Sequence, residues 1–142
     1  MRNKRVLVDT SAWIVSFKKK GNDELKEFLK RSLEEGTAAT NEMIILELLR
    51  ECRNKEEFQN LKTRLESLDR VEITKGVWER TFSLGFSLKT KGITIPTVDL
   101  VIACLAMEND CFLLHHDRHF AMMRSYPALQ LVDFLKGKED EL

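Results

Sequence analysis

The sequence predicts an α/β fold in which a parallel sheet is covered by helices on both faces. Short, mostly apolar runs typical of buried strands lie at 6–8, 111–114 and 129–132. Between them, longer segments carry apolar residues at helical spacing. Strands that alternate with helices form a parallel sheet with right-handed crossovers, because each connection returns over one face of the sheet.

Each expected strand is short and is bounded by turn residues or by the start of a helix. VLV ends at Asp9 and turns directly into a helix, which suits a strand buried on both faces. TAAT is a weaker strand pattern, and VEI is a further candidate. The expected strands are 6–8, 37–40, 71–73, 111–114 and 129–132.

Each expected helix has a start signal, a stop signal or an apolar stripe. Thr10 or Ser11 can cap the first helix, and Asn41 opens the third. The helix that starts at Pro96 and Thr97 reads VDLVIACLAM, which is apolar nearly all round and typical of a helix buried against a sheet. The expected helices follow Ser11 and then span 23–35, 42–51, 58–68, 76–89 (with Trp78 and Phe82 inside), 97–107 and 118–124.

Length and composition favour one domain over residues 1–142. The chain is 43% hydrophobic, enough for a proper core, and no apolar stretch reaches the roughly 18 residues that a membrane helix needs. The N-terminus lacks a signal-peptide pattern, so we expect a cytoplasmic protein whose three cysteines are reduced. Lys plus Arg equals Asp plus Glu, at 23 each, so net charge argues neither for nor against a nucleic-acid partner.

Most acidic residues lie among other polar residues, but a few interrupt apolar runs. A carboxylate drawn towards a core is unfavourable unless it is hydrogen-bonded, paired with a cation or bound to a metal. The interrupting acids are therefore candidate site residues. They are Asp9, Glu47, Asp99, Asp117 and Asp133.

The expected topology brings most of these acids to one edge of the sheet. Ligands of an open parallel sheet bind at the carboxyl ends of its strands, and Asp9 and Asp117 each follow a strand there. Asp99 lies in the first turn of a helix that enters from the same edge, where the helix dipole favours an anion. Glu47 lies about a turn and a half into its helix, so its longer side chain can reach back. Asp133 also follows a strand, and periodicity leaves its role open.

Each acid also has a purely structural interpretation. Asp9 and Asp117 can cap the helices that follow them. Asp99 can be an ordinary first-turn acid, and Glu47 can pair with Arg50. Four separate roles need not converge in space, whereas three or four carboxylates with retained waters are what Mg²⁺ or Mn²⁺ requires. A shared metal site is therefore the better explanation of the set.

The segments that carry these acids resemble the PIN domain, and most closely its VapC-type toxins from toxin–antitoxin modules. The matching segments, in order, are VLVDTSAWI, TNEMIILELL, IPTVDLVIACLA and LLHHDRHF, and the resemblance covers nearly the whole chain. It implies a three-layer sandwich with a mostly parallel central sheet of about five strands. It also implies a ribonuclease that cleaves single-stranded or structured RNA with Mg²⁺ or Mn²⁺ as cofactor.

The resemblance carries over to individual positions. Thr10 or Ser11 matches a hydroxyl that supports the metal from beside the first acid. His115 stands where many members have Thr or Ser, and it could contact a phosphate. Asp133 matches no acidic position of the family and is expected to be structural. The family's four acidic positions match Asp9, Glu47, Asp99 and Asp117.

The expected chemistry is metal-assisted hydrolysis of a phosphodiester. The metal would generate a hydroxide near neutral pH and neutralise the developing negative charge. Asp9 and Asp99 would ligate the ion directly, while Glu47 and Asp117 would ligate through water or orient the attacking water. Asp117 is thus counted with Asp9 and Asp99 among the metal residues. By the same resemblance we expect a small antitoxin protein and a second copy of the chain as partners.

Three other functions remain open at this point. His115 and His119 would share a face and could bind zinc if both were helical. Asp9 could be the nucleophile of a phosphotransfer enzyme, although Ser11 stands where the second Asp of a DxD pair would be. The chain could also be a metal-free RNA-binding or protein-interaction domain of the same fold.

Overall fold

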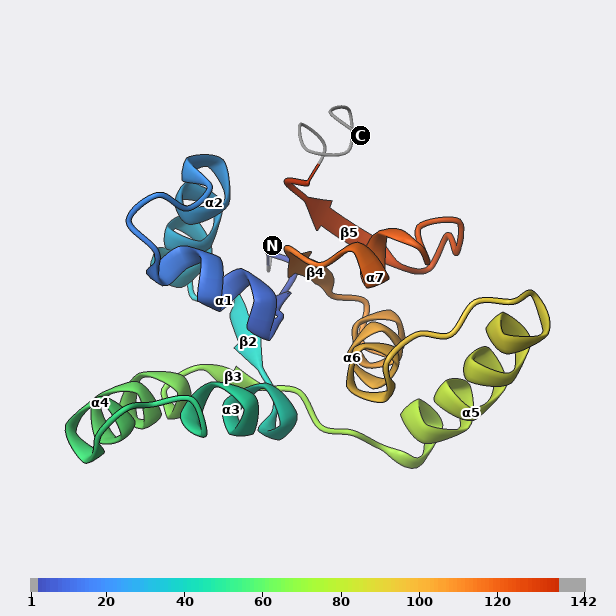
Figure 1. Cartoon of the computed structure of the whole chain (residues 1–142), viewed down its shortest axis with the longest axis horizontal. Coiled ribbons are helices and arrows are strands. Elements are labelled where there is room, and N and C mark those ends of the chain that lie inside the picture. Colours follow the sequence, from blue (N-terminus) through green and yellow to red (C-terminus); the bar gives the residue numbers. More distant parts are fainter. Residues whose placement is uncertain (1–2, 136–142) are drawn as a thin grey trace.

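A five-stranded parallel sheet forms the centre of the molecule, as a computed structural model that describes residues 3–135 shows (Figure 1). The order across the sheet is β3-β2-β1-β4-β5, and every neighbouring pair is parallel. This confirms the predicted fold class. The strands are β1 (Val6–Val8), β2 (Ala38–Thr40), β3 (Asp69–Arg70), β4 (Phe112–His115) and β5 (Gln130–Asp133).

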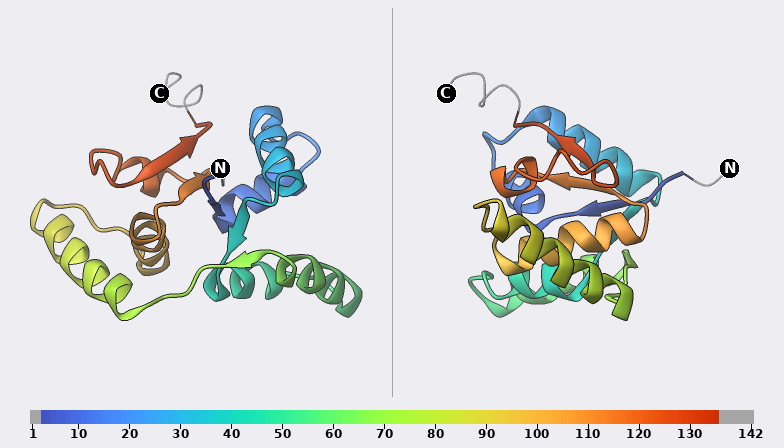
Figure 2. Two further views of the ribbon diagram at one scale, coloured as in Figure 1. Left: turned by 180° about the vertical axis from the view of Figure 1, so that it is seen from behind. Right: turned by 90° about the vertical axis from the view of Figure 1, so that its right-hand side faces the viewer.

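Helices cover both faces of this sheet. Helices α1 and α2 lie on one face, while α6 lies on the other with α5 packed outside it (Figures 1 and 2). Helices α3 and α4 lie by the β2–β3 side, and α7 lies beside β5. The helices are α1 (Thr10–Phe17), α2 (Asp23–Glu34), α3 (Glu42–Leu49), α4 (Lys55–Glu66), α5 (Lys75–Thr90), α6 (Thr97–Glu108) and α7 (Arg118–Ala121).

The core lies where α6 meets the central strands. Every residue of β1 is buried, and α6 is buried continuously from Val101 to Met107, as its apolar sequence predicts. Burying a Val, Leu, Ile or Met side chain stabilises the fold by about 1.5–3 kcal/mol. The two segments therefore fix the centre of the sheet. No helix in the described part of the chain is both long and apolar enough to cross a bilayer.

Two local expectations were wrong. The third strand is Asp69–Arg70 rather than 71–73, because backbone pairing with β2, not apolar character, defines this edge strand. Val71 is still 1% exposed, and its N–H donates to the Thr40 carbonyl at 2.8 Å, so the apolar signal marked the residue next to the strand. The cap of α1 is Asp9, not Thr10 or Ser11.

Helix α5 presents its aromatic residues to solvent. Trp78, Phe82 and Phe86 are 37%, 62% and 75% exposed, and the rings of Trp78 and Phe82 stack on each other at 6.2 Å. The buried face instead carries Val77, Thr81, Leu84 and Leu88. An exposed aromatic row of this kind is typical of an interaction surface.

Candidate active site

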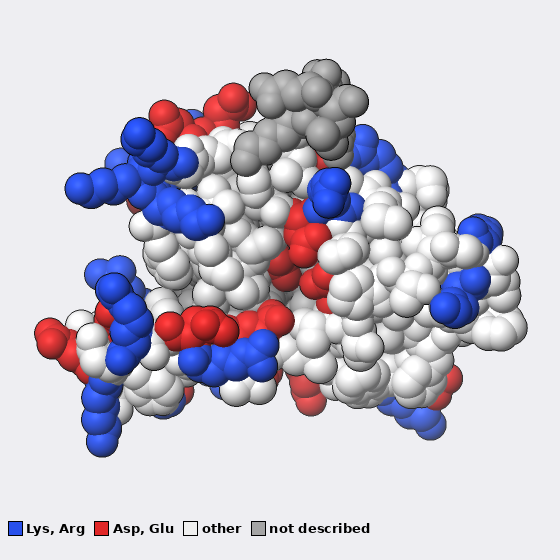
Figure 3. All heavy atoms as spheres, in the orientation of Figure 1, with Lys and Arg blue, Asp and Glu red and all other residues white. Residues whose placement is uncertain are grey.

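The carboxyl ends of β1 and β4 define one edge of the sheet, from which α1 and α7 depart. Val8 pairs with Leu114, and the Asp9 N–H continues this pairing with a 2.9 Å bond to the Leu114 carbonyl. Asp9 and Asp117 therefore leave two adjacent parallel strands at the same level. Figure 3 shows Asp and Glu side chains gathered in a depression at this place, between the two helical sides of the molecule.

Asp9 is a buried acid whose carboxylate is hydrogen-bonded by Ser11. Its side chain accepts two hydrogen bonds at Oδ2, from the Ser11 N–H at 2.9 Å and from Ser11 Oγ at 2.6 Å, and the residue is only 3% exposed. Its pKa is raised to about 6, chiefly by burial; the Ser11 hydrogen bonds lower the pKa, and the charges of Glu47 and Asp117 raise it. Ser11 Oγ in turn accepts from the His116 N–H at 2.9 Å, which ties the two strand ends together.

Glu47 reaches the same edge from α3. Its Oε1 accepts a 2.7 Å hydrogen bond from Thr10 Oγ1, the first residue of α1. The two neighbouring hydroxyls thus have separate tasks: Ser11 holds Asp9, and Thr10 holds Glu47. A bond between a hydroxyl and a charged carboxylate is among the stronger hydrogen bonds in proteins.

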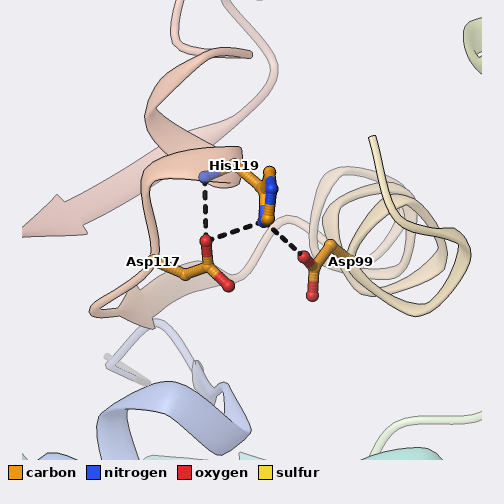
Figure 4. A group of neighbouring side chains, drawn as sticks. All are labelled: Asp99, Asp117 and His119. Atoms are coloured by element: carbon orange, nitrogen blue, oxygen red, sulfur yellow. Dashed lines mark hydrogen bonds and ion pairs between the residues drawn. The ribbon is translucent and has the colours of Figure 1, made fainter. Parts of the chain in front are cut away.

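Asp117 and Asp99 face each other across the imidazole of His119 (Figure 4). Asp117 caps α7, since its Oδ1 accepts from the His119 N–H at 2.9 Å. His119 Nδ1 lies 2.9 Å from Asp117 Oδ1 and 3.2 Å from Asp99 Oδ2. Asp99 projects from the first turn of α6, where no side chain caps the helix.

The pKa of Asp99 shows that the four acids share one electrostatic environment. It is raised to about 6, chiefly by burial and then by the charges of Asp117, Asp9 and Glu47, while the charge of His119 lowers it. Each of these acids comes from a different element of the fold. They are therefore close enough to repel one another, which unrelated helix caps need not be.

His115 lies inside the protein rather than at the site surface. The residue is 0% exposed, its Nδ1 accepts the Asp117 N–H at 3.1 Å, and its ring packs edge-on against Phe120. Desolvation lowers its pKa, so it is held as a neutral imidazole against the nearby charge of Asp133. The expected contact of His115 with a phosphate is wrong, because the ring has no access to solvent. It supports the backbone that carries Asp117 instead.

The remaining candidates are accounted for by local contacts. Asp133 accepts from Arg124 Nη2 at 3.0 Å and from the Leu135 N–H at 2.8 Å, so its two carboxylate oxygens are engaged by local partners. The zinc pair is wrong, because His115 ends strand β4 and shares no helix with His119.

Sequence reasoning thus found His119 but gave it the wrong partner. The signal it missed is that the backbone N–H of the residue two positions after a capping Asp donates to that Asp, which brings His119 beside Asp117.

The donor set fits a divalent cation. Ligand atoms of Asp99, Asp117 and His119 lie within 4.8 Å of one another, and no other such group of three or more occurs among residues 3–135. His119 Nδ1 is shielded from solvent and has no hydrogen-bond donor or acceptor in proper geometry. Asp9 and Glu47 lie outside this group of three, with Oδ2 and Oε1 engaged by hydroxyls.

Comparison with known proteins relates the whole fold to one family and to toxin–antitoxin complexes. The model of the PIN domain family matches residues 6–125. No curated protein sequence matches the chain. Three solved structures are similar in fold. They are VapBC2 of Rickettsia felis bound to a promoter DNA fragment (20% identity, TM-score 0.73, covering 91% of this chain and 98% of that one), DNA-bound VapBC of Salmonella typhimurium (15%, 0.71, 92% and 98%) and VapBC-1 of nontypeable Haemophilus influenzae (20%, 0.72, 90% and 96%).

Proposed function

This chain belongs to the PIN domain family, and from that premise we propose that it is a metal-dependent endoribonuclease and the toxin of a toxin–antitoxin pair. Its substrate is single-stranded or structured RNA, and residues 1–142 act as one cytoplasmic nuclease domain. The observation that carries this proposal is geometric: Asp99, Asp117 and His119 bring ligand atoms within 4.8 Å of one another, beside the buried Asp9 and beside Glu47, which is held by Thr10. Burial and the neighbouring charges also raise the pKa of Asp9 and of Asp99 to about 6. Acids kept together at this cost in stability are typical of functional sites.

The proposed metal residues are Asp9, Asp99 and Asp117. A bound Mg²⁺ or Mn²⁺ supplies a Lewis acid and lowers the pKa of water, which is the chemistry that phosphodiester hydrolysis needs. Glu47, fixed by Thr10, orients the attacking water. Ser11 keeps Asp9 in one rotamer, and the His115 ring holds the backbone of Asp117, so both are positioning residues.

A basic hollow beside the acids suits the RNA backbone. It has a volume of about 480 Å³ and is lined by His119 and by Arg118 and Arg124 from α7 and the turn after it. Arg124 also pairs with Asp133, while the Arg118 side chain lies at the exposed start of α7. Guanidinium groups bind phosphates in a bidentate manner, so RNA can enter over α7 with its scissile phosphate directed at the acids.

The antitoxin proposal draws support from an apolar surface next to the site. Ile14 and Phe17 on α1 and Leu46 on α3 are 41%, 56% and 63% exposed, and Leu46 neighbours Glu47. An apolar helix or extended segment of a partner could cover these residues and offer an Arg to the acids. Solved structures with this fold include a toxin–antitoxin complex from Klebsiella pneumoniae. A homodimer completes the proposal, and the exposed aromatic row of α5 is the surface available for it.

The proposal is tested by an RNA cleavage assay on purified protein with Mg²⁺, with Mn²⁺ and with chelator. We expect cleavage only with metal, and none from Asp9→Asn purified in the same way, which controls for contaminating nucleases. Asn retains the capping oxygen of Asp9, so this variant keeps the start of α1. RNA binding without cleavage in all conditions would instead establish a metal-free RNA-binding domain.

The toxin role has a separate test in cells. Expression of the wild-type chain alone should arrest growth, whereas expression of Asp9→Asn to the same level should not. Harmless wild-type protein with cleavage activity in vitro would leave a nuclease that is not a toxin.

A further inference from the structure

His119 lies where a protein ligand of a metal ion would lie in addition to the carboxylates. Its Nδ1 is 2.9 Å from Asp117 Oδ1 and 3.2 Å from Asp99 Oδ2, and the Asp99 and Asp117 oxygens and this nitrogen form the only set of its kind in the described residues 3–135. Neighbouring ligands on a six-coordinate ion with bonds of about 2.1 Å are about 3 Å apart. The separations at His119 therefore match those of adjacent ligands on one ion.

The position of this imidazole is fixed by the backbone. The His119 N–H donates to Asp117 Oδ1, so the cap that starts α7 also sets the direction in which the ring leaves the helix. Nδ1 is shielded from solvent although 42% of the side chain is exposed, which means that the buried nitrogen is the one turned towards the two acids (Figure 4). No hydrogen bond of proper geometry engages this nitrogen.

We propose that His119 Nδ1 is a direct metal ligand and that it makes the site selective for Mn²⁺ over Mg²⁺. This rests on the proposed metal-dependent function. Mg²⁺ prefers an all-oxygen shell with several retained waters, whereas imidazole nitrogen favours first-row transition metals. Two carboxylates with one imidazole form a mixed N/O set, and Mn²⁺ accepts both kinds of donor. Without His119 the site is an ordinary carboxylate site that either ion fills.

A spectroscopic experiment tests the ligand directly. Pulsed electron paramagnetic resonance on the full wild-type chain loaded with Mn²⁺ should detect ¹⁴N coupled to the metal. The coupling should vanish in His119→Ala and persist in His116→Ala, a matched variant of the histidine that also lies near Asp117 in the sequence. Mn²⁺ bound with no ¹⁴N coupling in wild type would overturn the proposal, as would loss of the coupling in His116→Ala alone.

Calorimetric titration of each metal tests the selectivity. His119→Ala should weaken Mn²⁺ binding by about tenfold or more and leave Mg²⁺ binding within about twofold. Equal weakening for both ions would show that His119 acts only by holding Asp117 and Asp99 in place. The two failures are distinguishable: wild type that binds neither ion contradicts the proposed function itself, whereas wild type that binds Mn²⁺ without nitrogen contradicts only the role of His119.

Discussion

The acidic residues at the two ends of the parallel strands differ in their partners and in the direction of their pKa shifts. At the amino end, Asp110 lies 2.9 Å from Lys4 Nζ and accepts from Gln130 Nε2 at 2.9 Å, and these contacts lower its pKa. Asp69 at the same end lies 3.3 Å from Arg5 Nη1. At the carboxyl end, burial and neighbouring acids raise the pKa of Asp9 and Asp99 to about 6.

This difference in the partners of the acidic residues does not follow the size of the hollow at each end. The amino end carries the larger hollow, about 860 Å³ against about 480 Å³ beside α7, but Asp69 and Asp110 in its lining already have arginine and lysine partners. At the carboxyl end, by contrast, Asp99 and Asp117 both lie within 3.2 Å of the same histidine nitrogen, Nδ1 of His119. Carboxylates that lack a cationic partner within the protein are stabilised when they bind a cation from solution.

The largest expected difference between the two ends is in catalysis. Asp99→Asn should lose RNA cleavage by about a hundredfold or more, because removing one metal carboxylate costs several kcal/mol of transition-state stabilisation. Asp110→Asn, the same substitution at the other end, should cleave at the wild-type rate. Initial rates under saturating Mn²⁺ measure both. An Asp99→Asn enzyme with wild-type turnover would remove Asp99 from the site.

A second difference concerns stability in chelator. The pKa of Asp99 is raised from 3.8 to about 6, so the folded state binds this proton more tightly than the unfolded state does. Stability is therefore lost as pH rises from about 4 to about 6, and the loss is complete above the folded value. Asp99→Asn removes this penalty. A shift of this size corresponds to about 3 kcal/mol at about 1.4 kcal/mol per tenfold change in proton affinity, but solvent screens a partly exposed carboxylate. Asp99→Asn should therefore raise the free energy of unfolding by about 1–2 kcal/mol at pH 7.5.

The pH dependence supplies the control for this stability gain. Urea unfolding of both proteins should show the gap at pH 7.5 and a much smaller gap at about pH 4, close to the pKa of Asp99 in the unfolded state. Asp110→Asn should show no gain at any pH, because the pKa of Asp110 is lowered and its charge is stabilising. A gain for Asp110→Asn equal to that for Asp99→Asn would mean that the two ends do not differ.

A smaller effect is expected from the hydroxyl that holds Glu47. Thr10→Val keeps the shape of the side chain but removes its 2.7 Å bond to Glu47 Oε1. A hydrogen bond of this kind is worth about 1 kcal/mol, so cleavage should fall about three- to tenfold with the fold intact. Circular dichroism and cleavage rates measure the two quantities. Unchanged cleavage would show that the position of Glu47 does not depend on Thr10.

The central fold was readable from the sequence because its signals are local. VLV, FLL and the apolar helix after Pro96 bury nearly all their side chains, so hydrophobic runs alone mark β1, β4 and α6. The edge strand β3 was misplaced by two residues, since its side chains are exposed and only pairing with β2 defines it. The sequence also does not show which face of α5 packs against the core, because its aromatic face and its aliphatic face have the same helical period.

The site likewise has parts that the sequence predicts and parts that it does not. Acids that interrupt apolar runs carry a sequence signal, which is why Asp9 and Asp99 could be named in advance. The bond from Thr10 to Glu47 and the approach of His119 to Asp99 join elements far apart in the chain, and no local pattern encodes them. The burial of His115 was missed for a related reason, since the same HHD triplet can turn its first ring inwards or outwards.

The most direct test of a metal site at the carboxyl ends of the strands is to measure how much Mn²⁺ stabilises the folded state of the wild type, of Asp99→Asn and of Asp110→Asn. A ligand that binds only the folded state stabilises it by about 2.7 kcal/mol at one hundred times its Kd. Wild type and Asp110→Asn should both gain this amount in thermal unfolding, and Asp99→Asn should gain little at the same Mn²⁺ concentration. No gain in wild type, or an equal gain in all three proteins, would contradict a metal site at the carboxyl ends of the strands.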